Sequence, residues 1–337
     1  MLTHPSPGRI IVLVTQIRTS TARMEVLLSD DARCELLRIG EGLDARQPVR
    51  VKNDGIVVLD PEPVSAVQEK SDEQQGAGRP AARSRQRSSR RKGPSGRSRS
   101  SGTQPRLRSL SAVYQRQLED VQAAYPGVTF TSDEDGIWLS ARSQVLAGLG
   151  REAIFLIALP DTPEIEPRGW AFWSQEGQIE WIGDRHTNFF DGSVCAYSST
   201  HDQAWSTGGD LRTLLDLYSV WALRQLHLAV IGRWAGRQYA LLDPIGRPLP
   251  YYRLIEFTDD ELCSCDSGAC YGSCCKPRDL MINFLAAKQQ FDVLNPGRSI
   301  RDRRPPDAVL CSVRDGGALP RISDAHEPLR AYQSTPR

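Results

Sequence analysis

The chain has 337 residues, of which 39% are hydrophobic and 25% charged, and its formal net charge is only +1. This composition indicates a globular protein with a sizeable core and excludes a wholly disordered or fibrous chain. No stretch approaches the roughly 20 apolar residues of a transmembrane helix, and the apolar run at residues 10–14 is too short for a signal peptide. We therefore expect a cytoplasmic protein with reduced cysteines and no membrane contact.

The first part of the chain predicts a small β-rich domain over residues 1–63. The predicted elements are strands at residues 9–14 and 24–28, a short helix at 30–39, and a hairpin with strands at 49–51 and 56–59. This order of elements would suit a β-grasp-like domain.

Residues 64–108 predict a disordered linker. From Arg79 to Arg108 the chain carries eleven Lys or Arg and no acidic residue, among Ser, Gly and Pro. Since the whole chain has a charge of +1, the remainder carries −10. The linker is either a solvated tether or a contact for nucleic acid or an acidic partner. It lacks the aromatic residues that stack on bases, which argues against sequence-specific RNA binding.

Residues 109–258 predict an α+β core, in which a helix precedes an antiparallel meander and a second helix follows. The predicted elements are a helix at residues 110–125, strands at 128–131, 137–141, 153–159, 170–173 and 179–182, and a helix from Asp210 to Val230. All seven tryptophans lie between Trp138 and Trp234, so we expect the main core here.

An isolated cysteine, Cys195, follows the polar tripeptide His186-Thr187-Asn188 after a Gly-containing turn. Thiolates are strong nucleophiles and their thioesters stay reactive toward amines, so Cys195 is a candidate catalytic nucleophile. The alternative is that Cys195 is a small apolar side chain and that the polar residues before it serve only the turn. A Trp205-Ser206 turn follows, and then the second helix begins.

This order of residues resembles the active-site region of ubiquitin-conjugating enzymes, in which a His-Pro-Asn tripeptide precedes the cysteine and a Trp-Ser-Pro turn follows it. Thr187 and Thr207 stand where that family has proline. The resemblance implies a ubiquitin-conjugating-like core whose Cys195 carries a modifier as a thioester. It assigns Asn188 to the oxyanion, His186 to pinning the loop, and Asp202, or His201 beside it, to orienting or deprotonating the incoming lysine.

Five of the eight cysteines lie between residues 263 and 275. Four of them, Cys263, Cys265, Cys274 and Cys275, have a spacing that resembles the SEC-C zinc motif, although Asp266 replaces its usual glycine. Four thiolates close a tetrahedral structural Zn²⁺ site. Cys270 is a spare thiol or an alternative ligand, and a disulfide-laced loop would need an oxidising compartment.

The zinc motif and a helix at residues 279–291 define a knuckle over residues 259–292, and residues 293–337 predict an irregular tail. Lysine is scarce, with five against thirty-seven arginines, which is typical of a GC-rich bacterial genome. With the zinc motif, this makes the resemblance closest to prokaryotic ubiquitin-conjugating-like proteins, a group often encoded in antiphage defence loci.

We therefore expect an enzyme that transfers a ubiquitin-like modifier from an activating enzyme to an amine of a protein substrate. Two alternatives stay open. One is an inert conjugating-fold protein that binds such a modifier. The other is a cysteine hydrolase, which would need a histidine able to approach Cys195.

Overall fold

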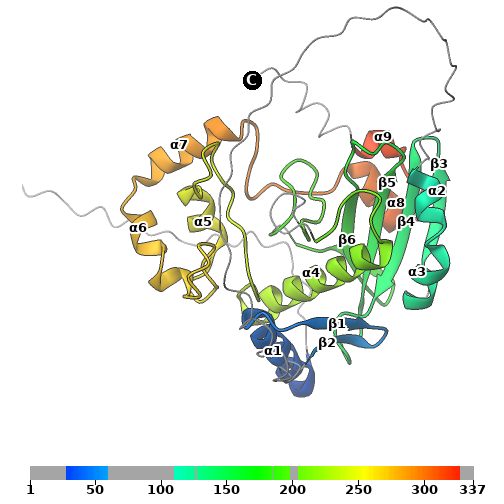
Figure 1. The fold of residues 1–337 in the computed structure, drawn as a ribbon, viewed down its shortest axis with the longest axis horizontal. Coiled ribbons are helices and arrows are strands. Elements are labelled where there is room, and N and C mark those ends of the chain that lie inside the picture. The colour runs from blue at the N-terminus through cyan, green and yellow to red at the C-terminus, as the bar shows by residue number, and fades with distance from the viewer. Residues whose placement is uncertain (1–27, 60–109, 126, 184, 198–203, 327–337) are drawn as a thin grey trace, which may run out of the picture.

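The computed structural model describes residues 28–59, 110–125, 127–183, 185–197 and 204–326, and it confirms the predicted α+β class (Figure 1). The described β-structure forms two antiparallel sheets, one with two strands and one with five. The basic linker, the predicted strand at residues 9–14, and that at 24–28 apart from Leu28 lie outside the described residues.

The five-stranded sheet is a meander in which each strand pairs with the next in sequence. Its strands are β3 (Thr129–Asp133), β4 (Gly136–Ser143), β5 (Glu152–Pro160), β6 (Arg168–Gln175) and β7 (Gln178–Trp181). They match the predicted strands except at their ends. The central strand β5 is buried from Ala153 to Pro160 because both of its faces are covered, which explains its continuous apolar sequence.

One face of the sheet packs against α4 (Leu211–Ile231), which holds much of the main core. Asp210 caps this helix as predicted, accepting hydrogen bonds from the backbone amides of Arg212 and Thr213. Within the described residues, α4 is the one helix long and apolar enough to span a membrane. Eleven of its residues, among them Leu214 and Tyr218, are buried within the protein.

The helix predicted at residues 110–125 is broken into α2 (Leu110–Gln115) and α3 (Leu118–Ala124). The side chain of Gln117, at the break, accepts a hydrogen bond from the amide of Leu211 (2.7 Å) and donates one to the carbonyl of Gly209 (3.3 Å). These contacts satisfy backbone groups at the start of α4. A one-helix prediction was wrong here because it could not include this tertiary contact.

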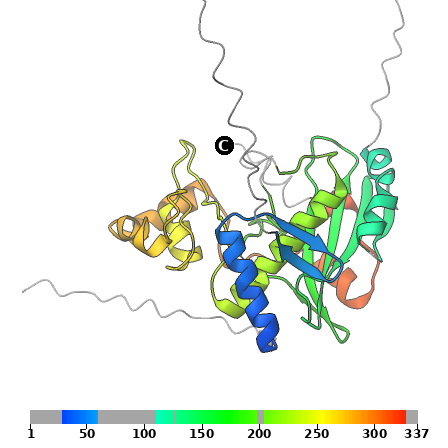
Figure 2. The same ribbon diagram turned by 60° about the horizontal axis from the view of Figure 1, so that its bottom comes forward.

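The N-terminal elements are α1 (Asp30–Asp44) and a hairpin of β1 (Val49–Lys52) and β2 (Gly55–Val58), which lie against α4 (Figure 2). The helix predicted at residues 30–39 continues to Asp44, because Gly40 allows a close approach to α4 and does not end the helix. A Cβ at Gly40 would lie 2.4 Å from Nε2 of His227. Leu36, Ile39 and Leu43 of α1 enter the same hydrophobic core as α4 and the sheet.

The C-terminal elements are α5 (Pro250–Glu256), the 3₁₀ turn η1 (Tyr271–Ser273), α6 (Lys276–Leu280), α7 (Phe284–Leu294), α8 (Asp307–Asp315) and α9 (Ile322–Ala325). The helix predicted at residues 279–291 is therefore two helices, α6 and α7, with Asn283 capping the second.

The prediction of an irregular tail after residue 293 was also wrong. Val309 of α8 and Ile322 of α9 pack against Trp138 and Trp170, on the opposite face of the sheet from α4. Nε1 of Trp138 donates to the carbonyl of Pro320 at 2.9 Å. The five-stranded sheet is therefore covered on both faces.

Candidate active site and metal centre

Residues 186–195 form a short hairpin between β7 and α4. Thr187 and Val194 form a β-bridge. The amide of Cys195 donates to the carbonyl of His186 at 3.0 Å. The amide of Val194 also donates to the carbonyl of Gly169 at 2.7 Å, which fixes the hairpin to β6. His186 and Cys195 are therefore opposite each other at the open end of the hairpin.

The closed end of the hairpin is a tight turn. The carboxylate of Asp191 accepts hydrogen bonds from the amide (3.0 Å) and hydroxyl (2.7 Å) of Ser193. Gly192 has φ of +60°, and a Cβ there would lie 2.6 Å from the carbonyl carbon of Arg304. Glycine is therefore required both by the backbone conformation and by the C-terminal segment packed over the turn.

The side chain of Cys195 is exposed, whereas Val194 before it is buried. The thiol lies near Tyr197 and Tyr218. Burial raises the pKa of both phenols, and the charge of a Cys195 thiolate contributes to the same direction. The hairpin thus presents one thiol to solvent near two neutral tyrosines, of which Tyr218 is buried and Tyr197 partly buried.

The side-chain amide of Asn188 lies within the hairpin. It donates to the hydroxyl of Ser193 at 2.9 Å and to the carbonyl of Ser193 at 3.4 Å. In this conformation Asn188 holds the turn together. Ser193 and Cys195 are two residues apart on one strand, so the structure brings Asn188 and Cys195 onto the same short ladder.

His186 is held from several sides. Its backbone has φ of +51°, and its ring stacks on Trp234 with centroids 3.9 Å apart. Its Nε2 lies 3.4 Å from Oε1 of Gln238, and its carbonyl accepts from Nε1 of Trp221 at 2.8 Å. Burial, reinforced by the neighbouring Arg185 charge, holds the pKa of His186 well below its usual value. The ring is therefore neutral at physiological pH and occupied by packing.

Asp202, the residue predicted to orient the acceptor amine, lies outside the described residues, as does His201 beside it.

A buried ion-pair network, which the sequence did not predict, lies next to the hairpin. Arg185 makes two 2.6 Å hydrogen bonds to the carboxylate of Glu261, which is fully buried. The same carboxylate accepts from the amide of Trp234 at 2.6 Å and from the amide of Thr258 at 3.0 Å. Glu261 is two residues from Cys263 and Arg185 is next to His186, so this network joins the cysteine cluster to the hairpin.

A second buried arginine, Arg303, holds the hairpin from the C-terminal side. Its guanidinium donates to the carbonyl of Thr187 at 3.1 Å and to the carboxylate of Glu256 at 2.6 Å, and it lies over the ring of Phe189 at 4.5 Å. In the sequence, Arg185 is simply an arginine before the hairpin and Arg303 an arginine in the tail. Neither position identifies its carboxylate partner, which lies 76 residues from Arg185 and 47 residues from Arg303.

Cys263, Cys265, Cys274 and Cys275 form a cluster that could hold a metal ion, with all four sulfur atoms within 4.8 Å of one another. The Cys265–Cys274 sulfur separation is 3.4 Å and the Cys274–Cys275 separation 3.9 Å. Disulfide sulfurs lie only about 2.05 Å apart. Tetrahedral Zn²⁺, with Zn–S bonds of about 2.3 Å, needs sulfurs roughly 3.8 Å apart. The cluster is thus compatible with zinc.

Two residues near the cluster, Cys270 and Asp266, have contacts outside it. Cys270 is outside the cluster, with its sulfur 3.5 Å from the carbonyl of Asp260. Asp266, at the usual glycine position, adopts the left-handed conformation (φ +60°) and pairs with Arg237 at 2.5 Å and Arg46 at 3.4 Å. The aspartate thus ties the cluster to the loop after α4 and to the end of α1.

The thiols of the cluster are not equivalent. A hydrogen bond from Ser267 is the main cause that lowers the pKa of Cys265 to about 6, whereas burial raises the pKa of Cys263 to about 12. Metal binding requires thiolates, so an incoming cation would displace protons from the cluster.

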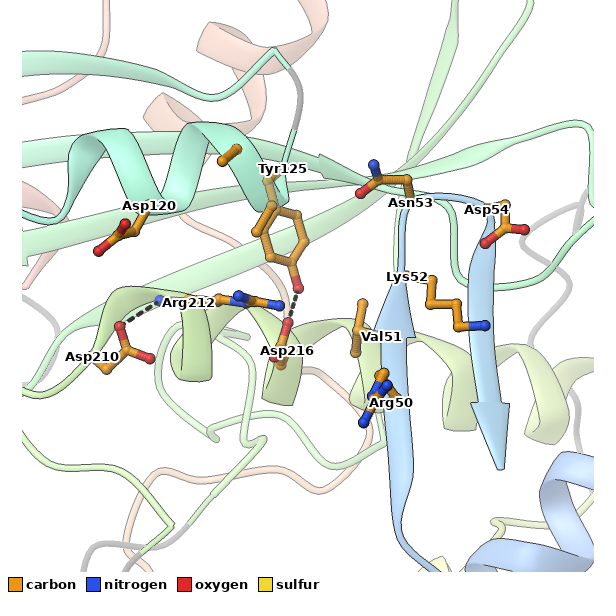
Figure 3. Close-up of a pocket in the computed structure, with 12 residues that line it drawn as sticks. Arg50, Val51, Lys52, Asn53, Asp54, Asp120, Tyr125, Asp210, Arg212 and Asp216 are labelled. Atoms are coloured by element: carbon orange, nitrogen blue, oxygen red, sulfur yellow. Dashed lines mark hydrogen bonds between the residues drawn. The ribbon is translucent and has the colours of Figure 1, made fainter. Parts of the chain in front are cut away.

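A cleft of about 660 Å³ lies apart from the hairpin, between β1, α3 and the start of α4 (Figure 3). Its lining mixes Arg50, Lys52 and Arg212 with carboxylates. Within it, the hydroxyl of Tyr125 donates to Asp216 at 2.6 Å, and burial raises the pKa of Asp216. Neither Cys195 nor the cysteine cluster lines this cleft.

No protein-family model, curated protein or solved structure matches this chain.

Proposed function

We propose that the protein is a ubiquitin-conjugating-like transferase that carries a ubiquitin-like modifier as a thioester on Cys195. The observation that supports this most is an exposed thiol at the open end of a hairpin that also contains Asn188 and is anchored from β6, Glu261 and Arg303. A carrier thiol has to be reachable by two large partners in turn. It also has to be held steadily, because misplacement of a reacting atom slows catalysis.

The proposed reaction has two acyl transfers. The Cys195 thiolate attacks the thioester carbonyl that joins the modifier to its activating enzyme, and the enzyme's thiolate leaves. An amine of the protein substrate then attacks the new thioester, Cys195 leaves as thiolate, and the amine proton passes to solvent or to a base, for which Asp202 is the candidate. The products are an amide and the regenerated thiol.

Each transfer places negative charge on a carbonyl oxygen. We assign Asn188 to this oxygen, because its amide is in the same ladder as Cys195 and can exchange its bonds to Ser193 for one to the oxyanion. His186, stacked on Trp234, keeps the open end of the hairpin in place.

The cysteine cluster has a structural role in this proposal, holding Zn²⁺ in the reducing cytoplasm of a bacterium. A function in antiphage defence would fit the group that the sequence resembles. Purified protein should contain about one zinc per chain, because four thiolates complete a tetrahedral site. Elemental analysis should show this stoichiometry retained in Cys270→Ser and lost in the Cys274→Ser, Cys275→Ser double variant. Equal zinc content in all three proteins would contradict the assignment.

An inert module that only binds a modifier is the second candidate, favoured by the two hydrogen bonds that hold the Asn188 amide nitrogen within the hairpin. A hydrolase has less support. Among the described histidines, His186 is packed against Trp234, while Nδ1 of His227 and of His326 each lie 2.8 Å from a backbone carbonyl.

The cognate activating enzyme, the modifier and ATP should charge Cys195 with an adduct that thiols cleave, and Cys195→Ala should abolish it. Asn188→Ala should still be charged but should discharge to amines roughly a hundredfold more slowly, the usual cost of losing one oxyanion donor. The measurement is single-turnover charging and discharge on non-reducing gels.

Ser193→Ala is the matched control, because it removes the hydroxyl that Asn188 contacts but keeps the amide. It should discharge at close to the parent rate. If Ser193→Ala and Asn188→Ala slow discharge equally, Asn188 only supports the turn. If the parent is never charged, the binding-module candidate replaces the enzyme.

A further inference from the structure

Strand β1 has one edge without a partner strand. Among the described strands, β1 pairs with β2 alone, in an antiparallel register that sets Val51 opposite Ile56. In such a pair, residues that bond the partner strand alternate with residues whose backbone groups point away from it. The amide of Leu59 donates to the carbonyl of Pro48 at 2.9 Å, which sets the phase of this alternation. The backbone groups of Val49 and Val51 therefore point away from β2.

The other edge of this small sheet shows the same alternation. The amide of Ile56 points away from β1 and donates to the carbonyl of Val145 at 3.2 Å. At Val51 no such partner exists within the described ranges, because neither its amide nor its carbonyl bonds another backbone group there. An unpaired strand edge of this kind is a template for another extended chain.

The cleft of about 660 Å³ lies along this edge of β1 (Figure 3). Arg50, Val51 and Lys52 line one side of it, and none of the lining residues belongs to β2. Helix α3 and the start of α4 form the other side, here called the helix side of the cleft. The volume lies within the range typical of ligand sites. Extended peptides bind such edges through their backbone, as added strands.

We propose that β1 binds an extended peptide segment of a partner protein as an antiparallel third strand, in which a lysine lies between two acidic residues. The lysine of the peptide exchanges backbone hydrogen bonds with Val51, and the acidic residues lie opposite Arg50 and Lys52. This binding is independent of the proposed reaction, since Cys195 does not line the cleft.

The outer face of β1 favours the two acidic residues. Arg50 and Lys52 are both exposed, and their two-residue spacing places them on one face of the strand. If Val51 bonds the added strand, Arg50 and Lys52 occupy the non-hydrogen-bonded positions, where side chains on neighbouring strands come closest. A carboxylate opposite each cation therefore forms a favourable cross-strand pair.

The helix side of the cleft favours the lysine. Val51 points to the opposite face of β1 from Arg50 and packs against the main core, so the peptide residue beside it also faces the helices. The helix side carries three carboxylates and one guanidinium, those of Asp120, Asp210, Asp216 and Arg212. The hydroxyl of Tyr125 donates to Oδ1 of Asp216, so Oδ2 of this carboxylate can accept from the lysine.

Titration of the full chain with the peptide acetyl-Thr-Glu-Lys-Glu-Thr-amide, followed by the chemical shifts of the protein amides, tests the proposal. The Val51 amide should shift in a saturable manner. The same peptide N-methylated at the lysine lacks the donor for the Val51 carbonyl and should bind roughly tenfold more weakly. The peptide acetyl-Thr-Lys-Glu-Lys-Thr-amide should also bind at least roughly tenfold more weakly, because like charges then lie opposite each other.

Variants of the protein test the same contacts. Val51→Pro removes the amide donor but keeps the bonds between β1 and β2, and it should weaken binding roughly tenfold. Val51→Ala is the matched control, since it keeps the amide, and it should bind with close to the parent affinity. The Arg50→Glu, Lys52→Glu double variant should lose the first peptide and bind acetyl-Thr-Lys-Lys-Lys-Thr-amide instead. Unchanged circular dichroism would show that the variants fold.

A parent protein that does not bind the first peptide, or that binds the N-methylated peptide equally well, would overturn the proposal. Binding that the charge variant loses but Val51→Pro keeps would also overturn it, because attraction of charges would then suffice without an added strand. A Val51 amide already protected from hydrogen exchange in the free protein would assign the edge of β1 to another segment of this chain and overturn it too.

Discussion

Removing zinc from the cysteine cluster is expected to unfold residues 259–292 and to loosen the hairpin that carries Cys195. Structural zinc contributes on the order of 10 kcal/mol of apparent folding free energy in small domains. Without it, the knuckle keeps the buried Asp279, which pairs with Arg253 and accepts from the Tyr271 hydroxyl, and one small apolar cluster. Tyr271, Phe257 and Phe291 form a small cluster that includes Cys263 and Cys275.

The loss should reach the hairpin through Glu261. This carboxylate lies two residues before Cys263 and accepts from both Arg185 and the amide of Trp234, the residue on which His186 stacks. When the knuckle unfolds, Arg185 loses its two short bonds to Glu261 and keeps only Gln238 at 2.9 Å and Glu256 at 3.7 Å. The amide of Trp234 loses its bond to the same carboxylate. The open end of the hairpin then keeps the bridge between Thr187 and Val194, the bond from Trp221 to the His186 carbonyl and the bond from Val194 to Gly169, but it loses the support from the knuckle side.

Hydrogen exchange measured by mass spectrometry checks this result. Peptides from residues 259–292 and 185–197 should exchange faster after chelation and recover when zinc is restored, while β5 should not change. Unchanged exchange in residues 185–197 beside a fully exchanging knuckle would show that the cluster does not support the hairpin.

Glu261→Ala is expected to lower the free energy of unfolding by about 3–5 kcal/mol, because the buried Arg185 guanidinium loses both of its 2.6 Å hydrogen bonds and keeps only the more distant carboxylate of Glu256 at 3.7 Å. Glu261→Gln should cost less, since the amide keeps one acceptor for Arg185 while losing the charge. Urea unfolding of the zinc-loaded proteins measures both losses.

Glu35→Ala is the matched control, because it removes a carboxylate of an i,i+3 pair with Arg38 on the surface of α1. A pair of this kind contributes up to about 1 kcal/mol. If Glu35→Ala and Glu261→Ala lower the free energy of unfolding equally, the buried network stabilises the fold no more than a surface ion pair does.

The sequence predicted the elements whose residues repeat with a clear period. The five strands and α4 follow from alternating or continuous apolar runs, and Asp210 is a recognisable helix cap. The cysteine cluster was also predictable, because metal ligands are close in sequence and their spacing carries the geometry.

Features that depend on distant contacts were not predictable. Gln117 breaks a helix because of a contact with residues more than ninety positions away. Helices α8 and α9 are short, and their fold depends on a sheet face lined by Trp138 and Trp170. The Arg185–Glu261 pair likewise joins two charged residues that each look like surface positions in the sequence.

The most direct measurement for the central proposal is a covalent trap at position 195. The Cys195→Lys variant is incubated with the cognate activating enzyme, the modifier and ATP, and the products are digested and sequenced by mass spectrometry. In this variant we predict an adduct that reductants do not cleave, in which an amide bond joins the carboxyl terminus of the modifier to the lysine at position 195. The parent protein should instead form a thioester adduct that thiols cleave. No adduct at position 195, or charging of Cys195→Ala at another thiol such as Cys270, would contradict the assignment.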